Sequence, residues 1–207
     1  MLLHRPFAAV TPTLDGPVLQ VLAGADSRFS VSQVTALVGD ASSAGIRKAL
    51  NRLVNHGLVV REGDGVAYLY QLNREHLLAG PVLEIARARE ALRERVAEHA
   101  NTWPVPPRLL ALFGSAARGQ MHPGSDLDLL AIADEPDDRW LDDLGRLCET
   151  MTAWTGNDTR SLVLTVDELA SDHEPVVAEL GRDAQVLFGD ATLLDRARRL
   201  ASRIGAA

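Results

Sequence analysis

Two carboxylates two positions apart, Asp126 and Asp128, are the side chains of this sequence best suited to chemistry. They open an apolar run with the length of a β-strand, and side chains at positions i and i+2 of a strand point to the same face. Two like charges held side by side repel each other unless a cation lies between them. Because Mg²⁺ prefers oxygen ligands and often binds one or two carboxylates together with substrate phosphates, the pair predicts a magnesium site.

A glycine–serine pair upstream has the features of a phosphate-binding turn. The apolar run 109–113, a second predicted strand, ends at Gly114 and Ser115. Glycine adopts backbone angles that other residues avoid and lets a triphosphate approach the main chain. If a helix opens at Ser115, its first N–H groups would donate to anionic oxygens. Arg118, about one helical turn later, could bind a phosphate with two hydrogen bonds.

Taken in order, this stretch resembles the motif Gly-Ser-x-x-Arg-Gly … Ser-Asp-x-Asp-Leu of nucleotidyltransferases in the DNA polymerase beta superfamily. The matching residues are Gly114, Ser115, Arg118, Gly119, Ser125, Asp126, Asp128 and Leu129. The string is most similar to that of the minimal nucleotidyltransferases, which include antibiotic nucleotidyltransferases and the antitoxin partners of HEPN-domain toxins. The resemblance implies an α/β fold, more narrowly an α+β fold, in which helices flank a mixed sheet.

The resemblance also implies an activity and a role for each matching residue. A metal-dependent enzyme would transfer a nucleoside monophosphate, with AMP from ATP as the expected case. The acceptor would be a hydroxyl group on a protein or RNA partner in a toxin–antitoxin-like system. The expected nucleotide-binding residues are Gly114, Ser115, Arg118 and Ser125. Of these, Ser125 is expected to order the turn into the second strand, while Asp126 and Asp128 hold Mg²⁺.

One position departs from the family pattern. Active members carry a third carboxylate on the following strand, where it completes the metal site or acts as general base. That position falls near Arg160 or Ser161 here, and neither residue is acidic. Asp158 would take the role if the strand begins earlier, so the expected catalytic residues are Asp126, Asp128 and Asp158. The alternative is a transcriptional regulator whose nucleotidyltransferase domain only binds nucleotide or is inactive.

Residues 1–75 have the pattern of a winged helix-turn-helix domain. Apolar spacing predicts one helix over 14–22, a second from an N-cap at Ser30 to Gly39, and a third from about Ser42 to His56. Two apolar runs, 58–60 and 67–70, flank a glycine-rich turn and predict a β-hairpin. This order resembles the winged helix of bacterial regulators, in which the third helix enters the major groove of DNA.

Polar side chains on the exposed face of the predicted third helix are suited to DNA. Arg47 and Lys48 match phosphates or guanine edges, and Asn51 matches adenine. The expected DNA-binding residues are Ser43, Arg47, Lys48 and Asn51 on the helix and Arg61 on the wing. Winged helices also dock proteins, so an operator, a docking partner and a homodimer all stay open at this point.

The rest of the chain divides into three predicted parts. Residues 76–104 are predicted as a connecting helix, which starts at Pro81 and runs to about Ala100, followed by a Pro-rich linker. Residues 105–190 form the predicted nucleotidyltransferase domain, with an amphipathic helix over 140–154 and a strand over 161–166. Residues 191–207 are predicted as a C-terminal helix.

Composition restricts the class of protein and its compartment. The 207 residues are 46% hydrophobic and 24% charged, which is typical of a soluble protein. Cys148 is the single cysteine, so no internal disulfide forms. No signal peptide or membrane-spanning run is evident, which predicts a cytoplasmic protein without membrane contact.

The charge of the chain is unevenly distributed. The net charge of −7 disfavours sequence-independent binding of nucleic acid. Residues 1–75, however, carry 7 Lys/Arg against 6 Asp/Glu (+1), whereas residues 76–207 carry 14 against 22 (−8). The acidity therefore belongs to the C-terminal part and leaves DNA binding by residues 1–75 open.

Overall fold

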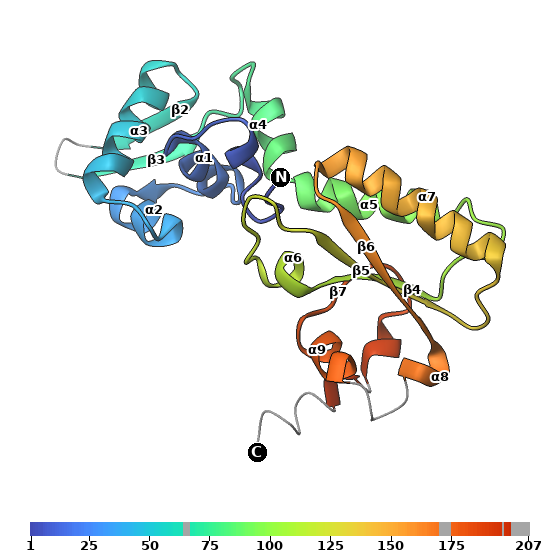
Figure 1. Ribbon diagram of the computed structural model, residues 1–207. Helices are drawn as coiled ribbons and strands as arrows, with labels where there is room; N and C mark the ends of the chain where they lie inside the picture. Colours follow the sequence, from blue (N-terminus) through green and yellow to red (C-terminus); the bar gives the residue numbers. More distant parts are fainter. Residues whose placement is uncertain (64–66, 170–174, 196, 200–207) are drawn as a thin grey trace. The chain divides into compact units, whose positions relative to one another are not determined.

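The computed structural model describes the chain apart from residues 64–66, 170–174, 196 and 200–207 (Figure 1). Contacts divide the chain into two compact units, the first Arg5–Arg89 and the second Met1–His4 together with the chain from Glu90 onward. The predicted α/β class is confirmed, because each unit combines helices with a sheet. Within the described part of the chain, no helix is both long enough and apolar enough to cross a membrane.

The first unit packs helices and a small antiparallel sheet around one core. Its elements are η1 (Pro6–Ala9), α1 (Asp15–Ala23), β1 (Phe29–Ser30), α2 (Val31–Val38), α3 (Ser43–Asn55), β2 (Val59–Gly63), β3 (Tyr68–Leu72) and α4 (Ala79–Ala86). The strand order is β1-β3-β2. Ser30 caps α2 through a capping box with Gln33, and Gly39, at φ 83°, ends it. The predicted helices and hairpin strands are confirmed, and the hairpin turn lies outside the described residues.

The region predicted as one connecting helix forms two helices. α4 ends at Ala86. The next residue, Arg87, has a φ of −95° and a ψ of 16°, which depart from helical values, and α5 (Ala88–Ala100) follows. α4 buries Val82 in the core of the first unit, whereas α5 buries Val96 in a core of the second. The single-helix prediction is wrong because the two halves bury their apolar faces in different cores. Pro81 is the third residue of α4 and not the first.

The second unit is a mixed four-stranded sheet covered by helices. Its further elements are β4 (Leu109–Phe113), α6 (Gly114–Arg118), β5 (Leu127–Ala133), α7 (Asp138–Thr155), β6 (Thr159–Thr165), α8 (Val166–Leu169), α9 (Pro175–Asp183), β7 (Gln185–Gly189) and η2 (Ala191–Leu194). The strand order is β6-β5-β4-β7, with β5 and β6 parallel and the other pairs antiparallel. α5 and α7 cover one face, and α8 and α9 cover the other (Figure 1). The predicted mixed sheet flanked by helices is confirmed.

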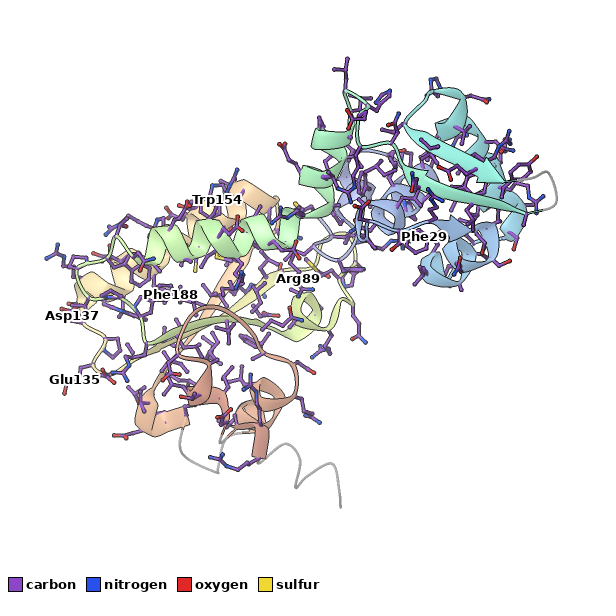
Figure 2. The ribbon with its side chains drawn as sticks, turned by 180° about the vertical axis from the view of Figure 1, so that it is seen from behind. Phe29, Arg89, Glu135, Asp137, Trp154 and Phe188 are labelled. Atoms are coloured by element: carbon purple, nitrogen blue, oxygen red, sulfur yellow. The ribbon has the colours of Figure 1, made fainter. Side chains whose placement is uncertain are left out.

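Side chains of the central strand alternate between two cores. In β5, Leu129 belongs to the core under α7, and Leu130 belongs to the core under α9. Asp137 caps the start of α7, and its Oδ1 accepts a hydrogen bond from the N–H of Trp140 at 2.8 Å; Trp154 lies near the other end of the helix (Figure 2). Because β5 is buried on both faces, polar groups of the strand can meet a ligand only at its ends.

The segment predicted as a C-terminal helix is described only in part. It opens with η2, where the Asp190 side chain accepts a hydrogen bond from the N–H of Thr192 at 2.9 Å. Leu194 and Ala197 are buried in the core under α9. Residues 196 and 200–207, over which this prediction extends, lie outside the described residues.

Candidate functional site

A tight corner between β4 and α6 presents the predicted phosphate-binding turn. β4 ends at Phe113, and Gly114 begins α6 with a φ of 66° that side chains other than glycine rarely adopt. A Cβ atom on Gly114 would overlap the Oδ2 atom of Asp128, which is paired with Phe113 across the sheet. Glycine is therefore required at this position for two reasons: the backbone conformation and the carboxylate that lies against it. Ser115 is the second residue of α6 and is half-buried.

The loop that leads into β5 is fixed by buried hydrogen bonds. Ser125 is 7% exposed, and its Oγ accepts a hydrogen bond from the N–H of His122 at 2.9 Å. This geometry fits the expected role of Ser125 in ordering the turn. Asn157, 5% exposed, donates from Nδ2 to the carbonyl oxygen of Ser125 at 2.8 Å. Its Oδ1 accepts from the amino group of Met1 at 2.5 Å.

Arg160 is one of the two residues near which the family pattern places a third carboxylate. In the parallel register of β5 and β6, Arg160 lies beside Asp128. Its Nη1 atom is 3.0 Å from Oδ2 of Asp126, and its Nε atom is 3.6 Å from Oδ2 of Asp158. The Asp126 side chain is 32% exposed, whereas those of Arg160 and Asp158 are 68% and 66% exposed. Asp126 and Asp158 thus share the guanidinium group of Arg160, at the end of the sheet where Asp128 lies in register beside it.

Arg118, the predicted phosphate-binding arginine, is tied to the C-terminal end of α9. Its Nη1 atom lies 2.8 Å from Oδ2 of Asp183, and its Nε donates to Oε1 of Gln120 at 3.1 Å. Gln185, at the start of β7, donates from Nε2 to the carbonyl oxygen of Ala117 at 2.6 Å. Both ends of this short helix are therefore fixed, one by Asp128 and the other by residues far along the chain.

The carboxylate oxygens at this end of the sheet suit a divalent cation, but they are few. Asp126 and Asp128 offer carboxylate oxygens, which are the ligands that Mg²⁺ prefers. Among the described residues, however, no group of three or more His, Cys, Asp or Glu side chains is placed to hold a metal ion. Asp158 does not complete such a group and is instead ion-paired with Arg160. The residues therefore fit one ion between two carboxylates.

The single cysteine lies on α7, the helix that packs against β6. Cys148 of α7 is half-buried and packs against the core under that helix. Burial raises the pKa of its thiol, a hydrogen bond with Ser161 acts in the opposite direction, and the charge of Asp158 raises the pKa further. The thiol is therefore kept protonated at neutral pH, which fits the expectation of a small apolar residue and not a reactive one.

A basic hollow lies on the exposed face of α3 in the first unit. It is lined by Ser43, Ala44, Arg47, Lys48, Asn51, Arg52, Asn55 and His56. Four predicted DNA-binding residues are thus brought together, and Arg61 does not line the hollow. Arg61 instead stacks over the ring of Tyr68, at 4.7 Å from its centre.

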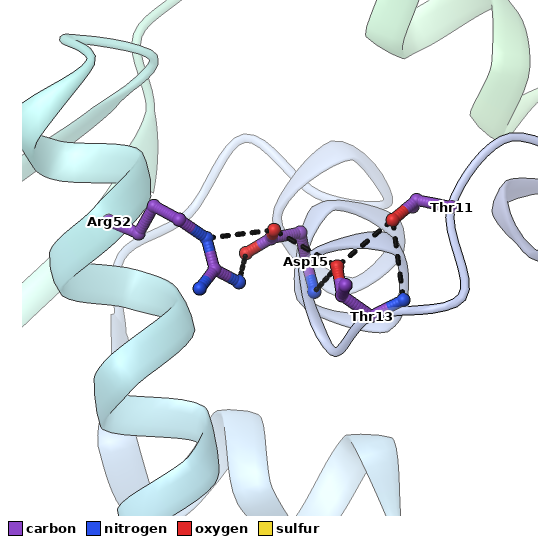
Figure 3. Close-up of polar contacts among 4 residues, drawn as sticks. All are labelled: Thr11, Thr13, Asp15 and Arg52. Atoms are coloured by element: carbon purple, nitrogen blue, oxygen red, sulfur yellow. Dashed lines mark hydrogen bonds and ion pairs between the residues drawn. The ribbon is translucent and has the colours of Figure 1, made fainter.

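Arg52 joins α3 to the start of α1 through a bidentate ion pair (Figure 3). Its Nε and Nη2 atoms donate to the two carboxylate oxygens of Asp15 at 3.0 and 2.6 Å. Thr13 donates to the same carboxylate at 3.0 Å. Arg52 is therefore held in place, and Arg47 and Lys48 supply the charge that faces solvent.

Sequence reasoning missed several residues that shape the sheet-end site. The sequence indicates Arg160 only as a position that lacks an acidic residue, and its local patterns do not mark Asn157 or Asp183 as parts of the site. The register of β5 and β6 identifies Arg160, but it is not readable from a single sequence. Asn157 carried a weak signal, because an amide directly after a helix-ending glycine and before a strand often bonds to neighbouring backbone.

Comparison with known proteins finds a match to one family model over part of the chain. Residues 87–187 match the model of the nucleotidyltransferase domain family. Similar solved structures include a toxin–antitoxin structure with AMP-PNP, at 17% identity over 56% of this chain and 90% of the other, with a TM-score of 0.39. A mutant of the toxin–antitoxin pair MntA-HpeT is 15% identical over 55% and 90% of the two chains, with a TM-score of 0.41.

A third similar structure comes from Shewanella oneidensis, a tri-AMPylated HEPN toxin in complex with MNT antitoxin. It is 15% identical over 56% of this chain and 89% of the other, with a TM-score of 0.38. No curated protein matches this chain.

Proposed function

We propose, from the premise that residues 87–187 form a nucleotidyltransferase domain, that this chain transfers a nucleoside monophosphate to a hydroxyl group of a macromolecule. AMP from ATP is the expected case, and a protein or RNA partner of a toxin–antitoxin-like system is the expected acceptor. The observation that carries the proposal is the meeting of the Gly114 corner with Asp126 and Asp128 at one end of the sheet. An anionic triphosphate and a divalent cation need these two features side by side.

Each residue then has a defined task in the transfer. The N–H groups at the start of α6 bind phosphate oxygens, and Arg118 is placed to contact another phosphate if it leaves Asp183. Asp126 and Asp128 would hold Mg²⁺, which supplies positive charge to the triphosphate when it is bound. The acceptor oxygen bonds to the α-phosphorus, the bond from that phosphorus to the bridging oxygen breaks, and pyrophosphate leaves. Asp158, exposed beside this site, takes the proton of the acceptor hydroxyl.

Transfer is tested with ATP, GTP, CTP and UTP labelled at the α-phosphate, incubated with Mg²⁺, the full chain and an extract of the source cells. The expected result is a labelled macromolecule that disappears when Asp126 and Asp128 are both changed to alanine. Asp134→Ala is the matched control, because Asp134 is an exposed aspartate at the other end of β5, ion-paired with Arg108 at 3.1 Å. Absence of label from all four nucleotides with the unchanged chain would contradict the proposal.

The basic hollow on α3 favours a second function, binding of an operator by the first unit as a winged helix. Arg47 and Lys48 would neutralise DNA phosphates, and Asn51 would contact bases. We expect Arg47→Ala with Lys48→Ala to weaken DNA binding, and the slope of log affinity against log salt to fall by about 2. Fluorescence anisotropy of labelled duplex DNA measures both. Arg74→Ala is the control, because Arg74 belongs to the same unit but pairs with Asp26 away from the hollow.

A further inference from the structure

Many enzymes that act on phosphate groups use two divalent cations. In this chain, the guanidinium group of Arg160 also places a positive charge beside the carboxylates at the end of the sheet. β6 places this residue beside Asp128 in register, and its side chain reaches Asp126 at 3.0 Å and Asp158 at 3.6 Å. A guanidinium group remains charged at any physiological pH. Because it is fixed to the strand, its positive charge is a permanent part of the site, unlike that of an ion from solution.

The position of Arg160 affects the net charge at this end of the sheet. Asp126, Asp128 and Asp158 carry three negative charges, and Arg160 compensates one of them. Three negative charges and one positive charge leave a net charge of −2, which one divalent ion offsets, so this end of the sheet attracts a second ion only weakly. Asp158, which would have to ligate a second ion, does not form a metal-holding group with the other two carboxylates among the described residues.

From these contacts we infer that the site binds one divalent ion with the triphosphate, and that Arg160 supplies the second positive charge. This inference rests on the proposed function and deepens it. The single ion lies at Asp126 and Asp128. The guanidinium group, 68% exposed and on the strand next to them, contacts a phosphate oxygen of the bound nucleotide.

The test counts Mn²⁺ ions by electron paramagnetic resonance, in the presence of saturating α,β-methylene-ATP, which cannot transfer its nucleotide. We expect one ion per unchanged chain and two ions per chain in Arg160→Asp, which restores a carboxylate beside Asp128. Arg108→Asp is the matched control, because Arg108 makes a similar exposed pair with Asp134 at the other end of the sheet. This variant should keep one ion.

Two ions in the unchanged chain, or one ion in a folded Arg160→Asp variant, would overturn the inference while leaving nucleotide transfer intact. A chain that holds neither Mn²⁺ nor the analogue would overturn the proposed function as well. If Arg160→Asp does not fold, Arg160→Gln removes the cation without adding a ligand. We expect it to keep one ion and to bind the analogue about tenfold more weakly. Unchanged affinity for the analogue would overturn the inference.

Discussion

The chain gathers charge in two places that are built in opposite ways. At the end of the second unit's sheet, the groups come from separate segments, with Gly114 on α6, Asp126 and Asp128 at β5, and Arg160 on β6. On the first unit, the hollow is lined by residues of α3 and its C-terminal cap alone. The sheet-end site therefore depends on the register of the fold, whereas the α3 face depends only on helical periodicity.

The balance of charge also differs between the two places. At the sheet end, arginine side chains pair with carboxylates, as in Arg160 with Asp126 and Arg118 with Asp183. On α3, Arg52 pairs with the carboxylate of Asp15, and the exposed side chains of Arg47 and Lys48 add further positive charge. The sheet-end site, where positive and negative side chains are paired, suits a ligand that brings a cation and an anion together. The basic face of α3 suits a polyanion.

The largest expected effect comes from filling the space between Gly114 and Asp128. Gly114→Val forces a positive φ on a branched side chain and pushes against the carboxylate. We expect the free energy of unfolding to fall by about 2–4 kcal/mol and binding of the metal–triphosphate to be lost. Denaturant unfolding and calorimetry measure the two quantities, and DNA binding by α3 should stay unchanged.

Gly145→Ala serves as the control for this substitution. Gly145 lies on the exposed side of α7, and a Cβ atom there would meet nothing within 4 Å. The change should raise the free energy of unfolding by about 0.5–1 kcal/mol. A Gly114→Val variant as stable as the unchanged chain would show that the corner is not built as described.

A smaller effect is expected from Asn157→Ala. The substitution removes the donor to the buried carbonyl of Ser125 and loosens the loop before Asp126. Loss of a partner for a buried polar group costs about 1–3 kcal/mol. Asn73→Ala removes the same kind of bond, to the carbonyl of Gly57 at 2.8 Å, but at an exposed position in the first unit. If thermal unfolding shows the same loss of stability for both variants, burial does not increase the contribution of the hydrogen bond to Ser125.

The smallest expected effect concerns Cys148, behind the sheet-end site. Its pKa is raised in the folded chain, so the folded state binds more protons than the unfolded state above the ordinary thiol pKa. Stability should therefore be fully present below that pKa and decline slightly as the pH rises above it. The stability of Cys148→Ala, measured by unfolding at several alkaline pH values, should not show this decline. The same dependence of stability on pH in both chains would contradict the prediction.

Local patterns predicted most of the elements, and long-range contacts account for what they missed. The caps at Ser30 and Gly39, the hairpin of the first unit and the β4–α6 corner were readable, because each is determined within a few residues. The break at Arg87 was not, since it depends on which core each half of the segment joins. Arg160 became part of the site only through strand register, which a single sequence does not contain.

The central claim, that the sheet end is a metal–triphosphate site, is tested most directly by calorimetric titration of ATP with and without Mg²⁺. The same titration is run on the chain with Asp126→Ala and Asp128→Ala. We predict that the unchanged chain binds ATP only with Mg²⁺ and that the double variant, folded by circular dichroism, shows no binding. Binding of equal strength by both chains, or no binding of ATP, GTP, CTP or UTP by the unchanged chain, would contradict the claim.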